Sequence, residues 1–101
     1  MKSRIEKLEE NITALKKQLL ELGPIHPGSL SKQIRKKNGE PYGEYWHLSY
    51  TFAGKGRTVY VPTPQLQHYN VRLKNFQRFR LLSDKIIELS IELSKLSLEA
   101  D

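Results

Sequence analysis

Three short stretches of the chain carry hydrogen-bonding side chains at every second position. Side chains two residues apart in an extended strand point to the same face, so paired strands would gather these groups on one surface. Glutamine, arginine, lysine, serine and threonine are side chains that form hydrogen bonds with base edges in the major groove of DNA. The residues expected on this face are Gln33, Arg35, Lys37, His47, Ser49, Thr51, Thr58 and Tyr60.

Further cations flank this face. Lys55 and Arg57 lie at a predicted hairpin and are assigned, with the residues above, to DNA binding. The residues assigned to phosphate contacts around them are Lys32, Lys36, Arg72, Lys74 and Arg78. For any single residue an ordinary solvated surface explains the pattern equally well. For the group as a whole, the scarcity of acidic residues favours a nucleic-acid surface.

The charge of the chain is concentrated in its middle. The 101 residues include 17 Lys+Arg and 11 Asp+Glu, for a formal net charge of +6. Residues 24–80 alone carry a net charge of +8, and the two ends together carry −2. Such a distribution places positive potential on one part of a small protein. We therefore expect an anionic partner.

The sequence offers no pattern that is typical of an enzyme. There is no cysteine, which excludes disulfides, zinc–thiolate sites and cysteine nucleophiles. The three histidines, His26, His47 and His68, share no metal-ligand spacing, and each is expected in packing or at the surface. Gly54-Lys55-Gly56 lacks the frame of a phosphate-binding loop, and a hairpin explains it. We expect no catalytic residue, no metal and no cofactor.

Residues 3–22 predict a helix with an apolar heptad pattern. Ser3 and Glu6 fit a capping box, and Gly23-Pro24 is expected to end the helix with Gly23 at the C′ position. Positions a and d of the heptads are Ile5, Leu8, Ile12, Leu15, Leu19 and Leu22. This narrow apolar stripe requires partner helices.

Residues 24–62 predict a three-stranded antiparallel meander. The alternation over 45–52 indicates a strand whose apolar face carries Trp46, Leu48, Tyr50 and Phe52. A turn over 53–56 leads to a return strand over 57–61, with Val59 and Val61 on the same face. Residues 29–37 form the third strand, with Leu30 and Ile34 inward, and a loop over 38–43 connects it to the next strand.

A second, long helix begins with Thr63 as N-cap and Pro64 in the first turn. Its first part, with Leu66, Tyr69, Leu73 and Phe76, is expected to cover the apolar face of the sheet. From Phe79 onward its heptads are expected to pack antiparallel to the first helix, with Leu22 near Phe79 and Ile5 near Leu96.

The apolar stripes of the two helices exceed what one chain can cover, so we expect a homodimer built as a four-helix bundle. The flanking stripe of Ile87, Ile91 and Leu98 requires the second chain. The residues assigned to the interface are Ile5, Leu8, Ile12, Leu15, Leu19, Leu82, Ile86, Ile87, Leu89, Ile91, Leu93 and Leu96.

The expected fold class is therefore α+β in a single domain, 1–101. An N-terminal coiled-coil helix (1–23), a basic β-meander (24–62) and a long C-terminal helix (63–99) follow one another. The three-stranded sheet is inserted between two long antiparallel heptad helices, which dimerise as a helical bundle. There is no apolar run of membrane-spanning length and no signal-peptide pattern at the N-terminus. We expect a cytoplasmic, nucleoid-associated protein with no membrane partner.

Two resemblances add to this interpretation. The pattern Gly28-Ser29-Leu30, then 45–50, Gly54-Lys55 and 57–61 followed by a helix resembles the arm-type DNA-binding domains of phage and transposon integrases, over about residues 28–80. In those domains a three-stranded sheet lies in the major groove. More closely, the segments 28–33, 43–50, 57–62 and 76–80 resemble a family of short bacterial proteins encoded near transposases and other mobile elements. Members of that family often carry cysteines in the first loop, whereas residues 36–41 have none.

The sequence therefore predicts a non-enzymatic, homodimeric protein that binds double-stranded DNA with sequence preference. The resemblance implies an accessory factor or regulator of a mobile element or phage, with a transposase or recombinase as a possible further partner. Two alternatives stay open. One is an RNA-binding module in which Tyr45, His47 and Tyr60 stack on unpaired bases. The other is a coiled-coil adaptor that binds proteins.

Overall fold

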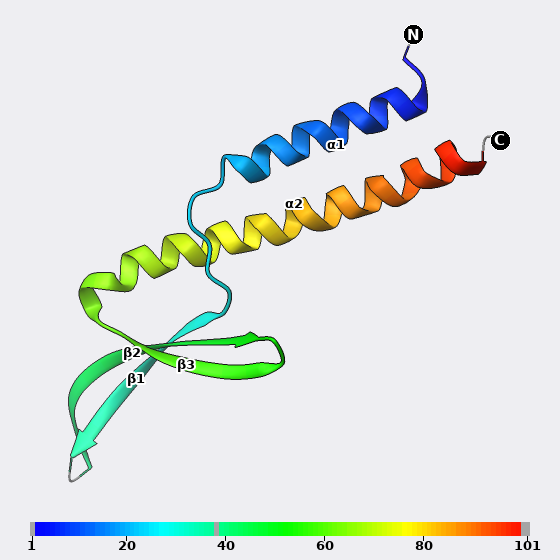
Figure 1. The fold of residues 1–101 in the computed structure, drawn as a ribbon. Coiled ribbons are helices and arrows are strands. Elements are labelled where there is room, and N and C mark those ends of the chain that lie inside the picture. The colour runs from blue at the N-terminus through cyan, green and yellow to red at the C-terminus, as the bar shows by residue number, and fades with distance from the viewer. Residues whose placement is uncertain (1, 38, 100–101) are drawn as a thin grey trace. The chain divides into compact units, whose positions relative to one another are not determined.

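The computed structural model describes residues 2–37 and 39–99, with the backbone alone for 35–37, 40–42 and 44. It is an α+β structure with one three-stranded antiparallel sheet, as the sequence predicts (Figure 1). The elements in chain order are α1 (Arg4–Leu20), β1 (Ser29–Lys37), β2 (Glu40–Phe52), β3 (Lys55–Val61), the 3₁₀ helix η1 (Thr63–Gln65) and α2 (Leu66–Glu99).

The chain divides into two compact units. The sheet unit is Pro24–Phe76, and the helical unit combines Met1–Gly23 with Gln77–Asp101. Helix α2 contributes to both units, and the division falls between Phe76 and Gln77. The apolar pattern of α2 changes phase between Phe76 and Phe79, so the predicted change of packing partner along this helix is confirmed.

The sheet has the order β1-β2-β3, so β2 is the central strand. Leu48 on β2 lies directly opposite Leu30 on β1 and Val59 on β3. Residues that lie directly opposite each other share a face. The register therefore puts Leu30, Leu48 and Val59 on one side of the sheet, as the alternation predicts. The pairing of β1 with β2 shifts register between Arg35 and Lys36.

The first turns of α2 bury one face of the sheet. Leu48 and Val61 are 0% and 1% exposed, and they form a core cluster with Leu73 of α2. Complete burial of such side chains contributes about 1.5–3 kcal/mol each to the free energy of folding. The partly buried side chains packed against this cluster are Leu30, Trp46, Tyr50, Leu66 and Tyr69. The expected covering of the sheet by α2 is confirmed.

The β-hairpin boundaries differ from those predicted. Strand β2 begins at Glu40, which pairs with Lys37, so the loop expected over 38–43 is wrong. Strand β3 pairs with β2 only as far as Trp46. Residues 40–45 are therefore part of a two-stranded ribbon with one free edge, which tolerates a proline such as Pro41. The second turn is tighter than expected, because β3 begins at Lys55.

That second turn consists of Ala53 and Gly54, whose φ angles are 53° and 78°. Positive φ at both central residues is typical of a type I′ turn, whose twist matches that of the flanking strands. Lys55 and Gly56, expected in the turn, instead belong to β3, where they pair with Phe52 and Thr51.

The predicted cap of the first helix is confirmed at its N-terminus, where the Glu6 backbone N–H donates to Ser3 Oγ at 3.2 Å. Its end differs from the prediction. The C-cap is Glu21, and Gly23 is not among the glycines with positive φ, so it does not form the expected C′ cap. Instead, the Leu22 N–H donates to the Leu19 carbonyl, which tightens the last turn.

Helix α2 likewise starts differently. The expected N-cap, Thr63, lies inside η1, and the cap position belongs to Pro62, which makes no side-chain cap hydrogen bond. The Gln65 N–H donates to the Pro62 carbonyl at 2.9 Å. The first turn is therefore of the tighter 3₁₀ kind, as is frequent at helix N-termini.

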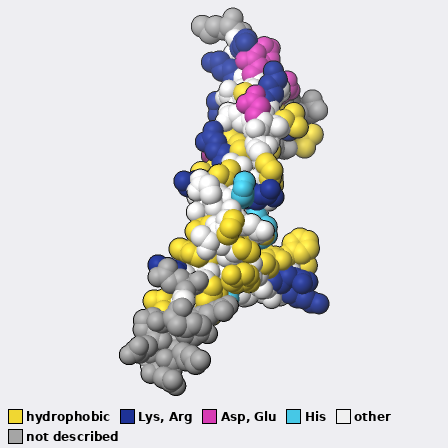
Figure 2. Space-filling view, turned by 90° about the vertical axis from the view of Figure 1, so that its left-hand side faces the viewer, with side chains coloured by type: hydrophobic (Ala, Val, Ile, Leu, Met, Phe, Trp, Pro, Cys, Tyr) yellow, Lys and Arg dark blue, Asp and Glu magenta, His cyan; other side chains and the backbone are white. Residues whose placement is uncertain are grey.

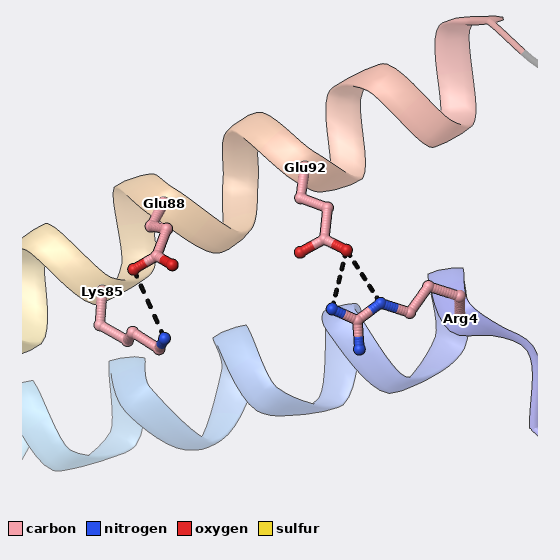
Figure 3. Close-up of polar contacts among 4 residues, drawn as sticks. All are labelled: Arg4, Lys85, Glu88 and Glu92. Carbon is pink, nitrogen blue, oxygen red and sulfur yellow. Dashed lines mark hydrogen bonds and ion pairs between the residues drawn. The ribbon is translucent and has the colours of Figure 1, made fainter.

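In the helical unit, α1 and the C-terminal part of α2 lie side by side and antiparallel (Figure 1). Leu8, Ile12 and Leu89 form its core, and Leu15, Ile86 and Leu93 pack against them. Arg4 Nη2 and Nε donate to Glu92 Oε1 at 2.7 and 2.9 Å (Figure 3). This ion pair joins the start of α1 to the C-terminal part of α2, as the predicted antiparallel packing requires.

A second apolar stripe on α2 lies outside this core. Ile87, Ile91 and Leu98 are 56%, 55% and 76% exposed. At 3.6 residues per turn, they lie on nearly the opposite side of α2 from Ile86, Leu89 and Leu93, which face α1. A single chain therefore leaves this stripe in water, as the sequence predicts.

Substitution of Gly28 should destabilise the sheet unit. Gly28 has a φ of +114°, and a Cβ there would lie 2.3 Å from the Ser49 carbonyl oxygen and 2.8 Å from Tyr50 Cβ. We expect Gly28→Ala to lower the free energy of unfolding by about 2 kcal/mol or more, because both strain and overlap result. Chemical denaturation measures this change.

The matched control is Gly56→Ala, since a Cβ there meets nothing within 4 Å. That variant should change stability by no more than about 0.5 kcal/mol. Equal stability of the two variants would contradict the tight entry of the chain into β1.

Candidate nucleic-acid interface

The face of the sheet opposite the Leu48 core is polar, and we call it the open face. Its register rows join all three strands: Ser31 pairs with His47, which pairs with Tyr60. The structure thereby brings together most of the side chains predicted for base contacts. By register the open face contains Ser29, Ser31, Gln33, Tyr45, His47, Ser49, Thr51, Thr58 and Tyr60, and each is exposed or half-buried.

Three rings form a cluster at the centre of the open face. Tyr45 and His47 stand two residues apart on β2, with ring centroids 4.7 Å apart and planes at 71°. Tyr60 lies directly opposite His47 on β3, and its ring centroid is 6.3 Å from that of Tyr45 at 37°. Tyr60 is 54% exposed. Aromatic surfaces of this kind can stack on bases, because every base has a π-face.

Hydroxyl and amide groups surround the rings. Ser31, Ser49 and Thr58 are exposed neighbours of His47 and Tyr60 on the same face, and Gln33 is exposed opposite Tyr45. Among the described side chains of this face there is no carboxylate. An approaching phosphate chain would therefore meet donors and rings without electrostatic repulsion from the face itself.

The cations predicted near the hairpin lie on the face of the sheet opposite the open face. Arg57 pairs with Tyr50, and Lys55 pairs with Phe52. Both therefore share the side of the sheet that carries Leu48, although they lie near the strand end and are exposed. Lys32 pairs with Trp46 and therefore also lies on the side that carries Leu48. The structure does not bring these three residues onto the open face, so their role is restricted to its surroundings.

The remaining predicted cations fall into two groups. For Arg35, Lys36 and Lys37 the structure describes only the backbone, which forms the end of β1. On α2, Arg72 and Lys74 are exposed in the sheet unit. Arg78 belongs to the helical unit, where its Nη2 donates to Gln18 Oε1 at 2.7 Å.

Sequence reasoning left Ser31 and Tyr45 out of the predicted duplex-binding set. Tyr45 precedes His47 by two residues and so shares its face in any strand. Ser31 precedes Gln33 in the same way. The period of two that identified their neighbours was therefore sufficient to find both.

Comparisons with protein-family models, with curated proteins and with solved structures find no match to this chain. Within residues 2–37 and 39–99, no three His, Cys, Asp or Glu side chains come together as a metal site would need. The helices in the described part of the chain include none that is long and apolar enough to cross a membrane. Function is therefore inferred from the sheet and its surroundings.

Proposed function

We propose that this protein is a non-enzymatic nucleic-acid-binding protein that uses the open face, with duplex DNA as its first target. The observation that carries the proposal is the composition of this face. Exposed amide, imidazole and hydroxyl groups lie in register across adjacent strands, with no carboxylate among the described side chains. The resemblance to proteins encoded near transposases favours an accessory factor or regulator of a mobile element.

The dimensions of the sheet suit a duplex. Neighbouring strands are about 4.8 Å apart, so the backbones of three strands span about 10 Å. The major groove of B-DNA is about 12 Å wide and admits a β-ribbon. Gln33, Thr58 and Ser49 would then meet base edges. The exposed cations outside the open face, such as Lys55 and Arg57, would reach phosphates at the groove walls.

A second target, unpaired bases of RNA or single-stranded DNA, is favoured by the cluster of Tyr45, His47 and Tyr60. Proteins that read single strands present aromatic rings on an open sheet face. The ring centroids lie 4.7 and 6.3 Å apart, so an unpaired base that stacks on one ring would lie close to a second one. A binding series with random duplex DNA, random single-stranded DNA and structured RNA, at two salt concentrations, ranks the targets. The protein-binding adaptor would lead if none of them binds.

Tyr60 separates base stacking from hydrogen bonding. Tyr60→Ala should weaken binding of a single strand by about 1–3 kcal/mol, because a stacking ring is lost. Tyr60→Phe keeps the ring and should retain single-strand affinity, whereas it should weaken a duplex site that uses the hydroxyl. Fluorescence anisotropy with both targets measures these changes.

Both Tyr60 variants should keep the native fold, since Tyr60 is 54% exposed and its truncation removes little buried surface. Circular dichroism of both variants should match the unmodified protein. If Tyr60→Ala binds every target as tightly as the unmodified protein, the open face is not the binding surface.

Lys55 tests the phosphate contribution. Lys55→Ala should weaken all duplexes alike and reduce the slope of log K against log salt by about one, as the loss of one phosphate contact predicts. The matched control is Lys16→Ala, which removes the same charge from the exposed surface of α1. A change of equal size in both variants would mean that net charge alone, and not the sheet unit, attracts the duplex.

We further infer that the protein is a homodimer held by its helices. Leu8, Ile12 and Leu89 are already buried within one chain, so they support the helical unit first. The part of the assigned interface that one chain leaves exposed is Ile87, Ile91 and Leu96, with Leu98 beside them. A second copy that presents the same stripe would form an isologous contact, which completes the expected bundle.

The double variant Ile87→Lys, Ile91→Lys should be a folded monomer, because both side chains are more than half exposed within one chain. Light scattering at micromolar concentration measures the mass. Leu89→Ala, between these two positions in the sequence but on the buried side of α2, should instead lower stability by about 2–5 kcal/mol. A monomeric mass for the unmodified protein would contradict the bundle.

A further inference from the structure

A cavity of about 430 Å³ lies on the α2 side of the sheet unit, away from the open face. Its lining consists of His26, Gln65, His68, Tyr69 and Arg72. All five residues belong to the sheet unit. The last four follow the spacing i, i+3, i+4, i+7 from the end of η1 into the first turns of α2 and so lie on one side of this helical segment. A cavity of this size lies in the range of small-molecule sites.

His26 is held firmly in the wall of the cavity. Its backbone N–H donates to the Arg72 carbonyl at 3.1 Å. Its ring lies edge-on to Tyr50, with centroids 4.8 Å apart, and to Tyr69, at 5.7 Å. The segment before it is tied down as well, because Asn75 Nδ2 donates to the Pro24 carbonyl at 2.9 Å. The wall is thus formed before any ligand binds.

The hydrogen bonds of His26 leave one ring nitrogen for a ligand. Nδ1 lies 2.6 Å from the Pro27 carbonyl oxygen. A carbonyl oxygen only accepts, so Nδ1 is the protonated donor. Nε2 is then the remaining polar atom of this half-buried ring.

Most of the other polar side chains of the cavity make no hydrogen bond or ion pair within the described part of the chain. Within the described part of the chain, no side-chain partner is found for Gln65, His68 or Arg72. The lining contains a guanidinium, two imidazoles, an amide and a phenol, and it contains no carboxylate. On the face drawn in Figure 2, His side chains lie beside Lys or Arg side chains, and Asp and Glu lie over the helical unit. The guanidinium and the lack of a carboxylate in this lining favour an anionic ligand over a cationic one.

We propose that this cavity binds a phosphomonoester, with the planar fork of Arg72 on the phosphate oxygens, Gln65 and His68 as further donors, and His26 in the cavity wall. Arginine matches phosphate geometry with two parallel hydrogen bonds. The cavity is larger than a phosphate ion, so it has room for the organic group of an ester beside Tyr69. That ester can be a free nucleotide or the phosphorylated end of a strand. The inference does not rest on nucleic-acid binding at the open face.

NMR titration of the full chain tests this site with three probes: inorganic phosphate, a 5′-phosphorylated dinucleotide and the same dinucleotide without the phosphate. The histidine ring resonances of His26 and His68 should shift with the phosphorylated dinucleotide. Inorganic phosphate should shift the same resonances more weakly. If the unphosphorylated dinucleotide binds as well, or if no probe shifts these resonances at millimolar concentration, the proposal is wrong.

Charge-removing variants distinguish binding in the cavity from non-specific electrostatic attraction of the phosphate to the protein. Arg72→Gln should weaken binding of the phosphorylated dinucleotide by about tenfold or more, because a charge-assisted hydrogen bond is lost. Lys74→Gln removes the same charge from the same helix outside the cavity and should have little effect. Tyr60→Ala, on the open face, should leave the histidine shifts unchanged. Equal weakening by Arg72→Gln and Lys74→Gln would overturn the proposal.

A phosphorylated strand that binds tenfold or more tightly than the free mononucleotide would identify a strand end as the source. Equal affinity would identify a free nucleotide. Both results support the phosphomonoester site. Because Tyr60→Ala and Arg72→Gln report on opposite sides of the sheet, failure at one site is distinguishable from failure at the other.

Discussion

The structure of the sheet unit depends on the burial of one sheet face beneath a single stretch of helix. Leu48 and Val61 are completely buried against Leu73, and the described residues of this unit form no second long helix that could cover the other face. The opposite face must therefore remain polar to stay in water. Binding groups placed there do not compete with the core. The same packing pins the segment before β1 against α2, which forms the wall of the cationic cavity around His26.

Much of this fold could be predicted from periodicity. The strand predicted over 29–37 has the observed bounds, and the alternation over 45–52 assigned the buried and open faces correctly. The ribbon over 40–43 could not be predicted, because Gly39, Pro41 and Gly43 are residues typical of turns. What makes this segment a strand is its pairing with the end of β1, and strand formation depends on cross-strand pairing that residue propensities alone do not report.

The candidate sites were predictable to different degrees. His47, Thr58 and Tyr60 share the open face because of a simple period of two, which also puts Arg57 on the opposite side. From η1 into α2, the spacing of Gln65, His68 and Arg72 already indicates one helix face. His26 is different, since its position depends on the chain folding back onto α2 after Pro24. No pattern in a single sequence reports that return, so the cavity could not be found before the structure.

The proposed dimer and the proposed nucleic-acid surface would strengthen one another. Residues 24–80 carry a net charge of +8, whereas residues 81–101 carry −3, so the cationic charge lies largely outside the helices that would associate. Each phosphate contact contributes about 0.9 to the slope of log K against log salt, and two linked copies would double the number of contacts. A second copy also binds at a high effective concentration once the first is bound. A small sheet with few base contacts would thereby bind nucleic acid more tightly as a dimer than as a monomer. The exposed apolar stripe of Ile87, Ile91 and Leu98 would supply the contact between the two copies.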